Sequence, residues 1–559
     1  MHERLAALRP HASPQPWWLS RGALVAWWLV AGAGLAVGLQ VPPVQRTQEA
    51  RVLETARQML GSGWRGWMGP MLNGQPRLRK PPLTYWMAAA AYEVAGVGEG
   101  AGRLPTALLG WLTVGVTFAC ARWLFGTRAA FFAAACLLCS YLFFRFSRLA
   151  ETDAPAMFFV TAAVYAFWRG VEGSGFTVQG SGEDGVVGSS LNPEPRTLNP
   201  SIWFHLGAAA TALAILSKGP PGAYPPLFLL AMVALRRKWK ALQRFITSGA
   251  PLTLILIAAP WFMYVFHTFG VEQWRRELDD LSGQDHPGHF YQYFYELFAA
   301  TAPWCLLLPV ALVDAVQSRQ DPRLHGLLAW LAVIFLPLCL IGNKQFHYLL
   351  PMMPPAMILI GWWIETALTK PGSAPLLDAT MVGSAIAIPG ILICARVMLG
   401  GITRADWALA AAIAAALLAV GWVCRRHGRA AGLLVYLAGV LVVLVVTVTL
   451  WMPRLEGEDS RALARQIEAS FGVGPYCFYG RNLSLPLCFN LRLAIPQKKT
   501  ANELQRLARD EPHVVVIAKT QPLSPAPALP AGFVEQRRIA VGRQMFIFYR
   551  HSGDIVAGR

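Results

Sequence analysis

Long apolar runs recur along most of this chain and are separated by short polar turns. A helix needs about 20 apolar residues to cross a bilayer, and thirteen runs approach or exceed that length. They lie near residues 17–39, 104–124, 128–147, 154–169, 203–217, 221–235, 247–267, 300–316, 325–341, 349–367, 377–399, 406–424 and 431–451. This pattern predicts an α-helical polytopic membrane protein with about thirteen transmembrane helices.

A fourteenth apolar run, 83–97, is short and contains Glu93. The basic residues decide whether it crosses, because loops rich in Lys and Arg stay in the cytoplasm. Arg4 and Arg9 place the N-terminus inside, and the basic cluster 236–240 falls on that side only if run 83–97 does not cross. We therefore expect a juxtamembrane or half-membrane helix there, a cytoplasmic N-terminus and a C-terminus on the periplasmic face of the inner membrane.

The composition agrees with a membrane protein, because 55% of the 559 residues are hydrophobic, 14% are charged and the mean hydropathy is +0.40. A soluble domain could not bury so much apolar surface. The formal net charge is +18, but the basic residues lie mainly in short loops between the apolar runs. This distribution predicts contact with anionic membrane lipids and argues against a nucleic-acid partner.

The chain divides into two parts on this basis. Residues 1–451 form the predicted transmembrane domain, with long outer-face loops at 40–82 and 267–299. Residues 170–200 are rich in Gly, Ser, Asn and Pro, which predicts a disordered cytoplasmic insertion. The composition changes after Trp451, and residues 452–559 read as a small periplasmic α/β domain. Its helical patterns lie at 460–470 and 501–510, and its strand-like runs lie at 475–479, 513–518 and 544–549.

Seven of the nine cysteines lie inside apolar runs, where they are expected to act as small hydrophobic residues. Cys477 and Cys488 stand apart in the C-terminal region. If that region is exported, these two could form a disulfide.

Polar residues gather on the predicted outer face. They come from the loops 40–82 and 267–299, the turn 148–153 and the segment 343–348, and Lys218 faces the same side. A catalytic site open to the periplasm requires such a collection of titratable groups.

Three features stand out among these residues. Arg79 and Lys80 lie at the foot of an apolar helix, where a bare charge is costly unless it is hydrated or paired. They either flank the helix at the interface or bind an anion. Asp153 lies between two spans and is either a functional carboxylate or a cap for the helix that Pro155 begins. Glu49 lies on an amphipathic helical stretch, which is a solvated face or part of the same site.

A metal site has little support in the sequence. Asp285, His286 and His289 have a spacing that could suit a metal, but two histidines and one aspartate in a loop are a weak pattern. The chain has no Gly-rich phosphate loop and no hydrolase-type Ser motif. We expect no cofactor.

Four short motifs occur in a characteristic order. They are Lys80-Pro81-Pro82-Leu83, Arg148-x-x-x-x-Asp153-Ala154-Pro155, Lys218-Gly219-Pro220 and Lys344-x-x-x-Tyr348-x-x-Pro351. In this order they resemble the bacterial polyprenyl-phosphate-dependent glycosyltransferases of the GT-C fold. That family includes the aminoarabinose transferase that modifies lipid A and, more distantly, the protein O-mannosyltransferases. The likeness covers most of the membrane part.

The resemblance implies a function and a set of residues. Such enzymes transfer a sugar from a polyprenyl phosphate at the outer face to a lipid or protein acceptor, so we expect a lipid (lipid A or lipopolysaccharide-like) or other cell-envelope acceptor. The family residues carry over to Lys80, Asp153, Lys218, Lys344 and Tyr348.

The sequence departs from the family at two positions. The first loop usually begins with Asp-Glu, and this chain has Gln48-Glu49. Arg79 stands where the aminoarabinose transferase has an acidic residue before the lysine. These departures weaken the case for a metal site inherited from the family. They also weaken the case for aminoarabinose as the sugar and lipid A as the acceptor.

The chemistry of transfer leads to a similar set of residues. Departure of a polyprenyl phosphate builds negative charge on its oxygens, which preorganised cations stabilise. A carboxylate can take the proton of an acceptor hydroxyl, whereas a phosphate acceptor needs no base and the carboxylate would then orient the sugar. We therefore assign the catalytic carboxylates to Asp153 and Glu49. The donor phosphate would be bound by Lys80, Arg79, Lys218, Lys344 and Arg148, and the remaining substrate contacts would come from Tyr348, His286 and Tyr85.

Two other functions also fit parts of the pattern. A transporter or flippase would share the many spans, but it is disfavoured by the lack of mid-span charges and of paired broken helices, and by the large outer loops. A non-catalytic relative is the third alternative, because the aspartate before Glu49 is missing.

Overall fold

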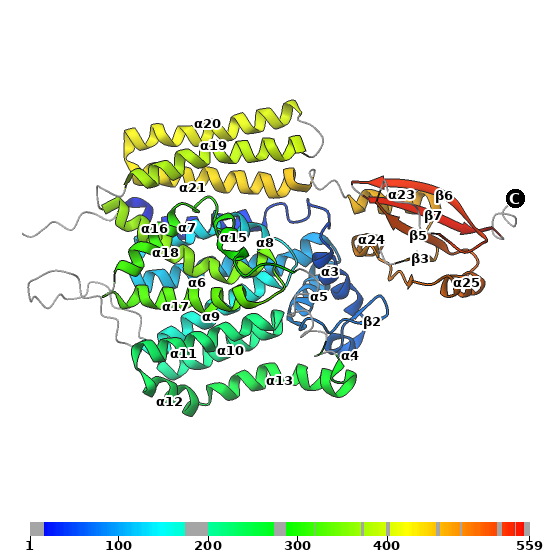
Figure 1. The fold of residues 1–559 in the computed structure, drawn as a ribbon, viewed down its shortest axis with the longest axis horizontal. Coiled ribbons are helices and arrows are strands. Elements are labelled where there is room, and N and C mark those ends of the chain that lie inside the picture. The colour runs from blue at the N-terminus through cyan, green and yellow to red at the C-terminus, as the bar shows by residue number, and fades with distance from the viewer. Residues whose placement is uncertain are drawn as a thin grey trace, which may run out of the picture.

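The computed structural model shows a bundle of long helices with a small α/β domain at one end (Figure 1). It describes residues 16–173, 199–272, 275, 287–318, 320–369, 374–398, 403–453, 459–480, 483–521, 528–542 and 544–552. Most of the predicted insertion, residues 174–198, lies outside the described residues.

Each of the thirteen predicted spans corresponds to a helix. These helices are α2 (Arg21–Ala36), α6 (Glu99–Phe125), α7 (Thr127–Leu138), α9 (Asp153–Glu172), α10 (Pro200–Lys218), α11 (Tyr224–Arg236), α13 (Ala250–Phe269), α16 (Leu307–Gln317), α17 (Pro322–Leu340), α18 (Met353–Thr369), α19 (Ala374–Met398), α20 (Arg404–His427) and α21 (Arg429–Val446). Within the described residues, eight helices are long and apolar enough to cross a membrane, namely α6, α9, α10, α13, α17, α19, α20 and α21. The polytopic helical fold is thus confirmed, while the count of thirteen spans stays a prediction.

Short elements connect these helices. They are η1 (Trp17–Leu19), α8 (Tyr141–Phe146), η2 (Pro220–Ala223), α12 (Trp239–Thr247), α15 (Gln292–Ala300), η3 (Phe346–Met352) and η5 (Thr447–Trp451).

The bundle is held by close packing of large and small side chains. Trp168, Trp304 and Trp330 are fully buried in its core. At Gly361 of α18 the helix backbone approaches that of α7 so closely that a Cβ would lie 2.5 Å from the Ala133 nitrogen. Glycine is therefore required where these two helices cross.

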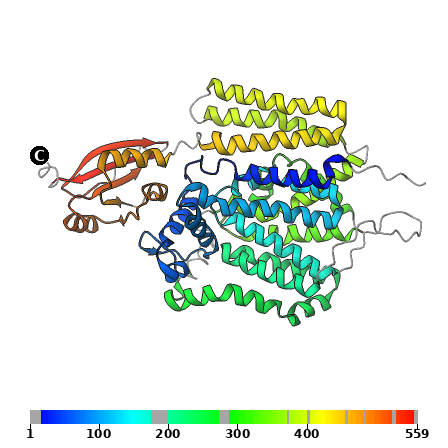
Figure 2. The same cartoon turned by 180° about the vertical axis from the view of Figure 1, so that it is seen from behind.

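The first loop predicted to lie on the outer face folds, together with the helix that follows it, into a cap at one end of the bundle. It contains α3 (Thr47–Met59), α4 (Gly63–Met68), the strands β1 (Met71–Leu72) and β2 (Gln75–Pro76), and α5 (Leu83–Ala95). Figures 1 and 2 show these elements between the bundle and the C-terminal domain. With 13 residues, α5 is about 20 Å long, too short for a hydrocarbon core of about 30 Å. Its buried face, including Tyr85 and Tyr92, packs on α3.

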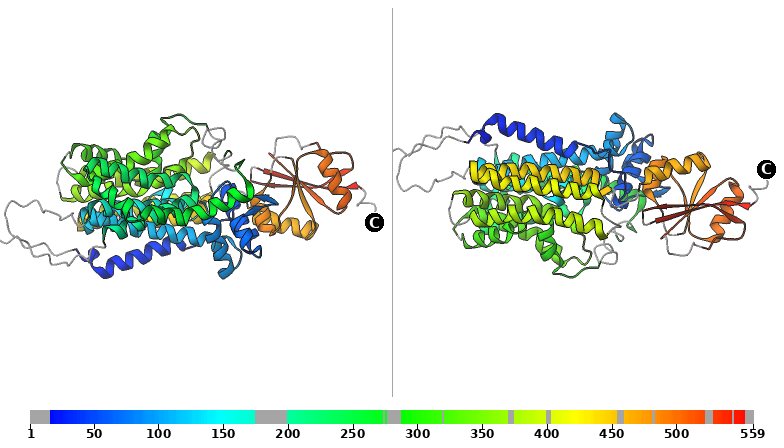
Figure 3. Two further views of the ribbon diagram at one scale, coloured as in Figure 1. Left: turned by 90° about the horizontal axis from the view of Figure 1, so that it is seen from below. Right: turned by 90° about the horizontal axis from the view of Figure 1, so that it is seen from above.

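The C-terminal domain is a five-stranded mixed sheet with helices. Its elements are α23 (Ser460–Phe471), β3 (Tyr476–Tyr479), α24 (Leu485–Leu491), β4 (Gln497–Lys498), α25 (Ala501–Asp510), β5 (Val515–Thr520), β6 (Phe533–Val541) and β7 (Gln544–His551). The strand order is β4-β3-β5-β7-β6, with β3 parallel to β4 and β5 and the remaining pairs antiparallel. Figure 3 shows this domain beyond the end of the helices. The expected small α/β fold is confirmed.

The disulfide considered from the sequence does not form. Both Cys477 and Cys488 are free and buried. Cys477 packs with Val516 in one apolar cluster, whereas Cys488 on α24 packs with Leu463 in another. The two thiols therefore belong to different packing layers of the domain.

Candidate active site

A polar cavity of about 500 Å³ opens at the end of the bundle that carries the cap. Residues of α3, the 77–85 segment, the turn before α9, the end of α10 and the 343–348 segment line it. Each predicted outer-face segment with described residues contributes to its wall except 267–299. The cavity thus joins residues that are up to about 300 positions apart in the sequence.

Asp153 and Lys218 form the centre of this cavity. Because α9 and α10 run antiparallel, the first residue of one meets the last residue of the other, and Lys218 Nζ donates a hydrogen bond to Asp153 Oδ1. Gly219 ends α10 with φ of 89°, a conformation that suits glycine. Thr152 is the N-cap residue of α9, and the Asp153 carboxylate makes no capping bond. The alternative that Asp153 is only a helix cap is therefore not supported.

Aromatic rings surround this ion pair. Lys218 Nζ lies 4.2 Å from the centroid of the Tyr348 ring, and His347 Nε2 lies 3.8 Å from Asp153 Oδ1. The His347 ring stacks on Phe146 at 5.3 Å. Burial lowers the pKa of His347 to about 4, although Asp153 acts in the opposite direction, so this ring is neutral at pH 7.

The cavity has more cations than carboxylates. Its lining includes five cationic side chains and two carboxylates, Glu151 and Asp153. The cations are Arg51, Arg77, Arg79, Lys80 and Lys218. Glu151 accepts a hydrogen bond from Arg46 Nε at 2.6 Å. The excess positive charge makes this cavity a site for an anion.

A smaller apolar recess of about 70 Å³ continues from the same residues. It shares Lys80, Asp153, Lys218, Asn343 and Tyr348 with the polar cavity. Its further lining is mainly apolar and comprises Ala156, Pro220, Pro221, Tyr224, Leu338, Ile341 and Pro351. An anionic head and an apolar tail could therefore be accommodated side by side.

Glu49 does not share the cavity with Asp153, which corrects the expected geometry. Its carboxylate accepts two hydrogen bonds from Arg103, at 2.7 and 2.9 Å, and one from the Ala150 N–H at 3.1 Å. The side chain is only 1% exposed. Glu49 therefore ties α3 to α6 and to the turn before α9.

Lys344 and Arg148 also point away from the cavity. Lys344 Nζ donates to the carbonyls of Leu338, Cys339 and Ile341 at 2.6–3.0 Å, so it caps the end of α17. Arg148 donates to the carbonyls of residues 34, 35 and 37 near the end of α2. These cations donate hydrogen bonds to carbonyl oxygens that have no partner within the helix at its C-terminal end.

The remaining predicted site residues either line the cavity or lie outside the described part of the chain. Arg79, Lys80 and Tyr85 line the cavity with Asp153, Lys218 and Tyr348. His286 lies outside the described residues. Among the residues that the structure describes, no group of three or more His, Cys, Asp or Glu side chains could hold a metal.

Sequence reasoning missed several residues of the wall. Arg51, Arg77, Glu151, Asn343 and His347 all line the cavity. Each lies within a few positions of a motif residue or on the amphipathic stretch of Glu49, so proximity to the motifs was the available signal. Arg46 could not have been chosen, because its contacts with Glu151 and with the Phe146 ring exist only in the folded structure.

Comparison with known proteins supports this picture. A family model described as dolichyl-phosphate-mannose-protein mannosyltransferase matches residues 79–177, the stretch that contains Lys80 and Asp153. An undecaprenyl phosphate-alpha-4-amino-4-deoxy-L-arabinose arabinosyl transferase from Edwardsiella ictaluri is 29% identical over 338 residues, which is 58% of this chain and 56% of that relative. The chain spans less than two thirds of the length of the curated relatives it matches.

The solved structures extend the likeness to nearly the whole chain. ArnT from Cupriavidus metallidurans, crystallised with undecaprenyl phosphate, superimposes with a TM-score of 0.73 at 22% identity, covering 95% of this chain and 98% of ArnT. Its apo structure gives a TM-score of 0.75, again at 22% identity, covering 94% of this chain and 98% of ArnT. At this identity the likeness establishes the fold. The chain therefore has the fold of ArnT, and the resemblance to polyprenyl-phosphate-dependent GT-C glycosyltransferases is confirmed.

Proposed function

We propose that this protein transfers a sugar from a polyprenyl-phosphate donor to a lipid or other cell-envelope acceptor at the periplasmic face of the inner membrane. One observation carries the proposal. A cavity with excess cations holds a buried, lysine-paired aspartate and continues into an apolar recess. That arrangement suits a ligand with a phosphate head and a hydrocarbon tail, and the related arabinosyl transferases are named for such a donor.

We assign the donor phosphate to Lys80, Arg79 and Lys218. All three side chains line the polar cavity, and Lys80 and Lys218 also line the apolar recess. A phosphate bound beside them would therefore leave the isoprenoid chain in apolar surroundings. Negative charge grows on the phosphate as it leaves the sugar, and fixed cations in a low-dielectric site stabilise that change. Lys344 and Arg148 are not assigned to the polyprenyl-phosphate donor, because their N–H groups donate hydrogen bonds to backbone carbonyls.

Asp153 is the proposed catalytic carboxylate. The bond between the anomeric carbon and the donor phosphate oxygen breaks, and a bond from that carbon to an acceptor oxygen forms. If the acceptor is a hydroxyl, its proton passes to Asp153. If it is a phosphate oxygen, no proton moves and Asp153 orients the sugar. Tyr348 and Tyr85, both on the cavity wall, are the proposed sugar or acceptor contacts.

Phosphate binding would also change the partner of Asp153. Lys218 donates to Asp153 in the structure, and an incoming phosphate offers this ammonium a second anion. Sharing Lys218 between the two would free one carboxylate oxygen for the substrate. The site would then become competent for chemistry only once the donor is bound.

The decisive experiment is a transfer assay with purified protein. The protein is incubated with polyprenyl-phosphate sugars and extracted membrane lipids, and the lipid products are analysed by mass spectrometry. We expect an acceptor whose mass rises by one sugar residue, together with free polyprenyl phosphate. Donor binding without any such product would contradict transfer, and movement of intact donor between the leaflets of a liposome would indicate a flippase instead.

A further inference from the structure

We propose that the C-terminal α/β domain positions α3, the helix that forms one wall of the cavity, and that Arg461 is the main positioning residue. This goes beyond the proposed function. Its kinetic test rests on that function, whereas its structural test does not.

Two surfaces of α3 carry the argument. Thr47, Gln48, Arg51 and Val52 line the cavity. Other positions, among them Leu53 and Met59, are buried in an apolar cluster that includes Leu485 and Phe489 of α24. One helix therefore contacts both the cavity and the C-terminal domain.

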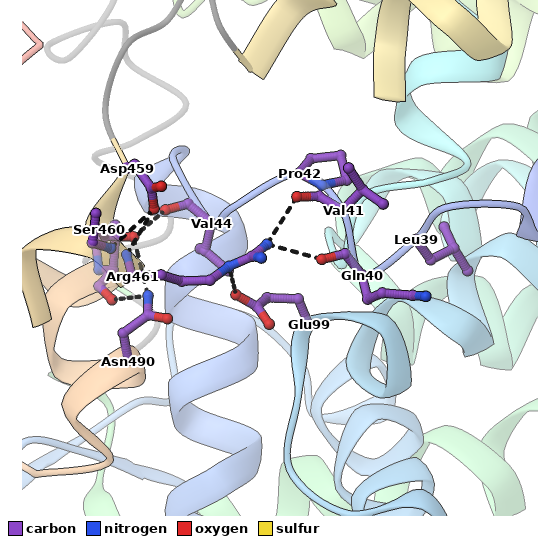
Figure 4. Close-up of polar contacts among 12 residues, drawn as sticks. Leu39, Gln40, Val41, Pro42, Val44, Glu99, Asp459, Ser460, Arg461 and Asn490 are labelled. Carbon is purple, nitrogen blue, oxygen red and sulfur yellow. Dashed lines mark hydrogen bonds and ion pairs between the residues drawn. The ribbon is translucent and has the colours of Figure 1, made fainter. Parts of the chain in front are cut away.

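Arg461 fastens the start of α23 to the bundle (Figure 4). Its Nη2 donates to the carbonyls of Gln40 and Val41 at 2.9 and 3.0 Å, and its Nε lies 2.7 Å from Glu99 Oε1. Gln40 and Val41 belong to the segment that leads into α3, and Glu99 begins α6. Because a guanidinium is planar and holds several partners in fixed directions, one side chain sets the relative position of three elements.

The neighbouring residues reinforce this contact. Ser460 Oγ donates to the Val44 carbonyl at 3.0 Å, three residues before α3 begins. Asn490 Nδ2 in turn donates to Ser460 Oγ at 3.0 Å, and Asp459 caps α23 by accepting from the Arg461 N–H. The anchoring side chains are thus held from within the C-terminal domain (Figure 4).

A second contact lies at the other end of α3. Gln58 Nε2 donates to Asn73 Oδ1 at 3.0 Å, and Asn73 Nδ2 donates to the Ile495 carbonyl of the C-terminal domain at 3.3 Å. The domain therefore holds α3 near both ends and through the apolar cluster between them. Since a misplacement of about 1 Å can cost on the order of 100-fold in rate, such support bears on catalysis.

The structural test compares Arg461→Ala with Arg465→Ala. Arg465 is an exposed arginine one turn further along α23 and serves as the matched control. Hydrogen–deuterium exchange is followed in peptides that cover 47–59. We expect faster exchange of α3 in Arg461→Ala and wild-type exchange in Arg465→Ala, with the transmembrane helices unchanged in both.

The kinetic test uses the transfer assay on the same variants. We expect Arg461→Ala to raise the KM for the donor about tenfold with a smaller change in kcat, because the wall that contacts the donor is displaced. Arg461→Lys should recover part of the loss, since an ammonium can keep the ion pair with Glu99 but not all three contacts.

Wild-type exchange of α3 in Arg461→Ala would overturn the proposal whatever the activity. A wild-type protein without transferase activity would refute the proposed function, while the exchange result would still decide this inference. If Arg461→Ala does not accumulate, Asn73→Asp replaces it, since that change removes the amide that donates to Ile495 and Cys488 of the C-terminal domain near the far end of α3. Wild-type exchange in that variant would overturn the proposal equally.

Discussion

Asp153 is the residue on which the proposed chemistry depends. Asp153→Asn keeps the shape of the side chain and removes its charge, so it isolates the role of the carboxylate. We expect turnover to fall at least ~100-fold, the usual scale for a positioned acid–base group. The variant should fold, because the asparagine oxygen still accepts from Lys218. Transfer assays on detergent-purified protein measure the effect, and near-wild-type turnover would remove Asp153 from the mechanism.

Glu49 should behave differently, because it is paired with Arg103 and does not line the cavity. Glu49→Gln leaves the buried Arg103 without its counter-ion, and breaking such a pair costs about 3–5 kcal/mol of stability. We therefore expect a marked drop in the thermal unfolding midpoint in detergent, with a smaller loss of turnover per folded molecule than in Asp153→Asn. A fully stable but inactive Glu49→Gln would restore Glu49 as a catalytic group.

Lys80 tests the phosphate site. Lys80→Ala removes a cation from the cavity, and loss of one such stabilising group typically costs about 10²–10³ in rate. We expect weaker donor binding as well, and partial recovery in Lys80→Arg, which keeps the charge with a different geometry. Lys499→Ala, an exposed lysine in the C-terminal domain, is the control. Normal donor affinity in Lys80→Ala would contradict the assignment.

His347 predicts a pH dependence of stability. Its folded-state pKa, about 4, lies below the ordinary value of 6.5 because the ring is buried, so between these values the unfolded chain binds a proton that the folded chain does not. The contribution of the neutral His347 ring to the free energy of unfolding is therefore fully present above pH 6.5 and is lost as the pH falls toward 4. The difference in unfolding free energy between wild type and His347→Gln should shrink from pH 7 to pH 5. A constant difference would contradict the buried, neutral ring.

The sequence predicted the cavity residues that belong to short motifs. It failed for residues whose role depends on a hydrogen-bond or ion-pair partner that is distant in the sequence or lies in the backbone. Lys80, Asp153 and Lys218 were predicted because each belongs to one of the four motifs and lies at the end of an apolar run. Lys344 follows the same pattern, yet its ammonium folds back on the carbonyls at the end of α17. Glu49 was misplaced because Arg103, its partner, lies 54 residues away and carries no local signal.

Among the elements, the apolar runs predicted the helices well because a continuous run is visible without knowledge of packing. The strand β6 was missed because six of its nine side chains are exposed, five of them in a row, which removes the alternation that marks a strand. The short α24 was missed as well. The helix has only seven residues, which is too short for the spacing of its buried leucines to show a helical period.

The crossing of α7 and α18 gives a prediction about one such element. Gly361→Ala would place a Cβ 2.5–2.8 Å from backbone atoms of α7, which cannot move aside as a side chain could. We expect a loss of about 1–3 kcal/mol from overpacking. Gly383→Ala on α19 is the matched control, because nothing lies within 4 Å of its Cβ position. Thermal unfolding of both variants in one detergent measures the contrast, and equal stability would show that the helices separate readily.

At the scale of the whole molecule, the cap and the C-terminal domain lie at the same end of the bundle (Figure 1), and residues of the cap line the cavity. The predicted topology already places both on one side of the membrane, but it does not predict that the domain and the cap are in contact. The basic loops orient the chain, but only the contacts of α3 and Arg461 show that the domain touches the cap.

Orientation is the last prediction. Thirteen crossings with an inward N-terminus put the C-terminal domain and the cavity in the periplasm, because the basic cluster at 236–240 then stays inside. Single cysteines are introduced as Val473→Cys, at an exposed site in the C-terminal domain, and Arg237→Cys in that cluster, in a background where the exposed Cys394 is alanine. In spheroplasts, a membrane-impermeant maleimide should label Cys at 473 and should reach Cys at 237 only after permeabilisation. The reverse pattern would place the cavity in the cytoplasm. Labelling of both from outside would mean that the number of crossings between them is even, and one of the seven spans predicted between residues 247 and 451 would then have to be revised.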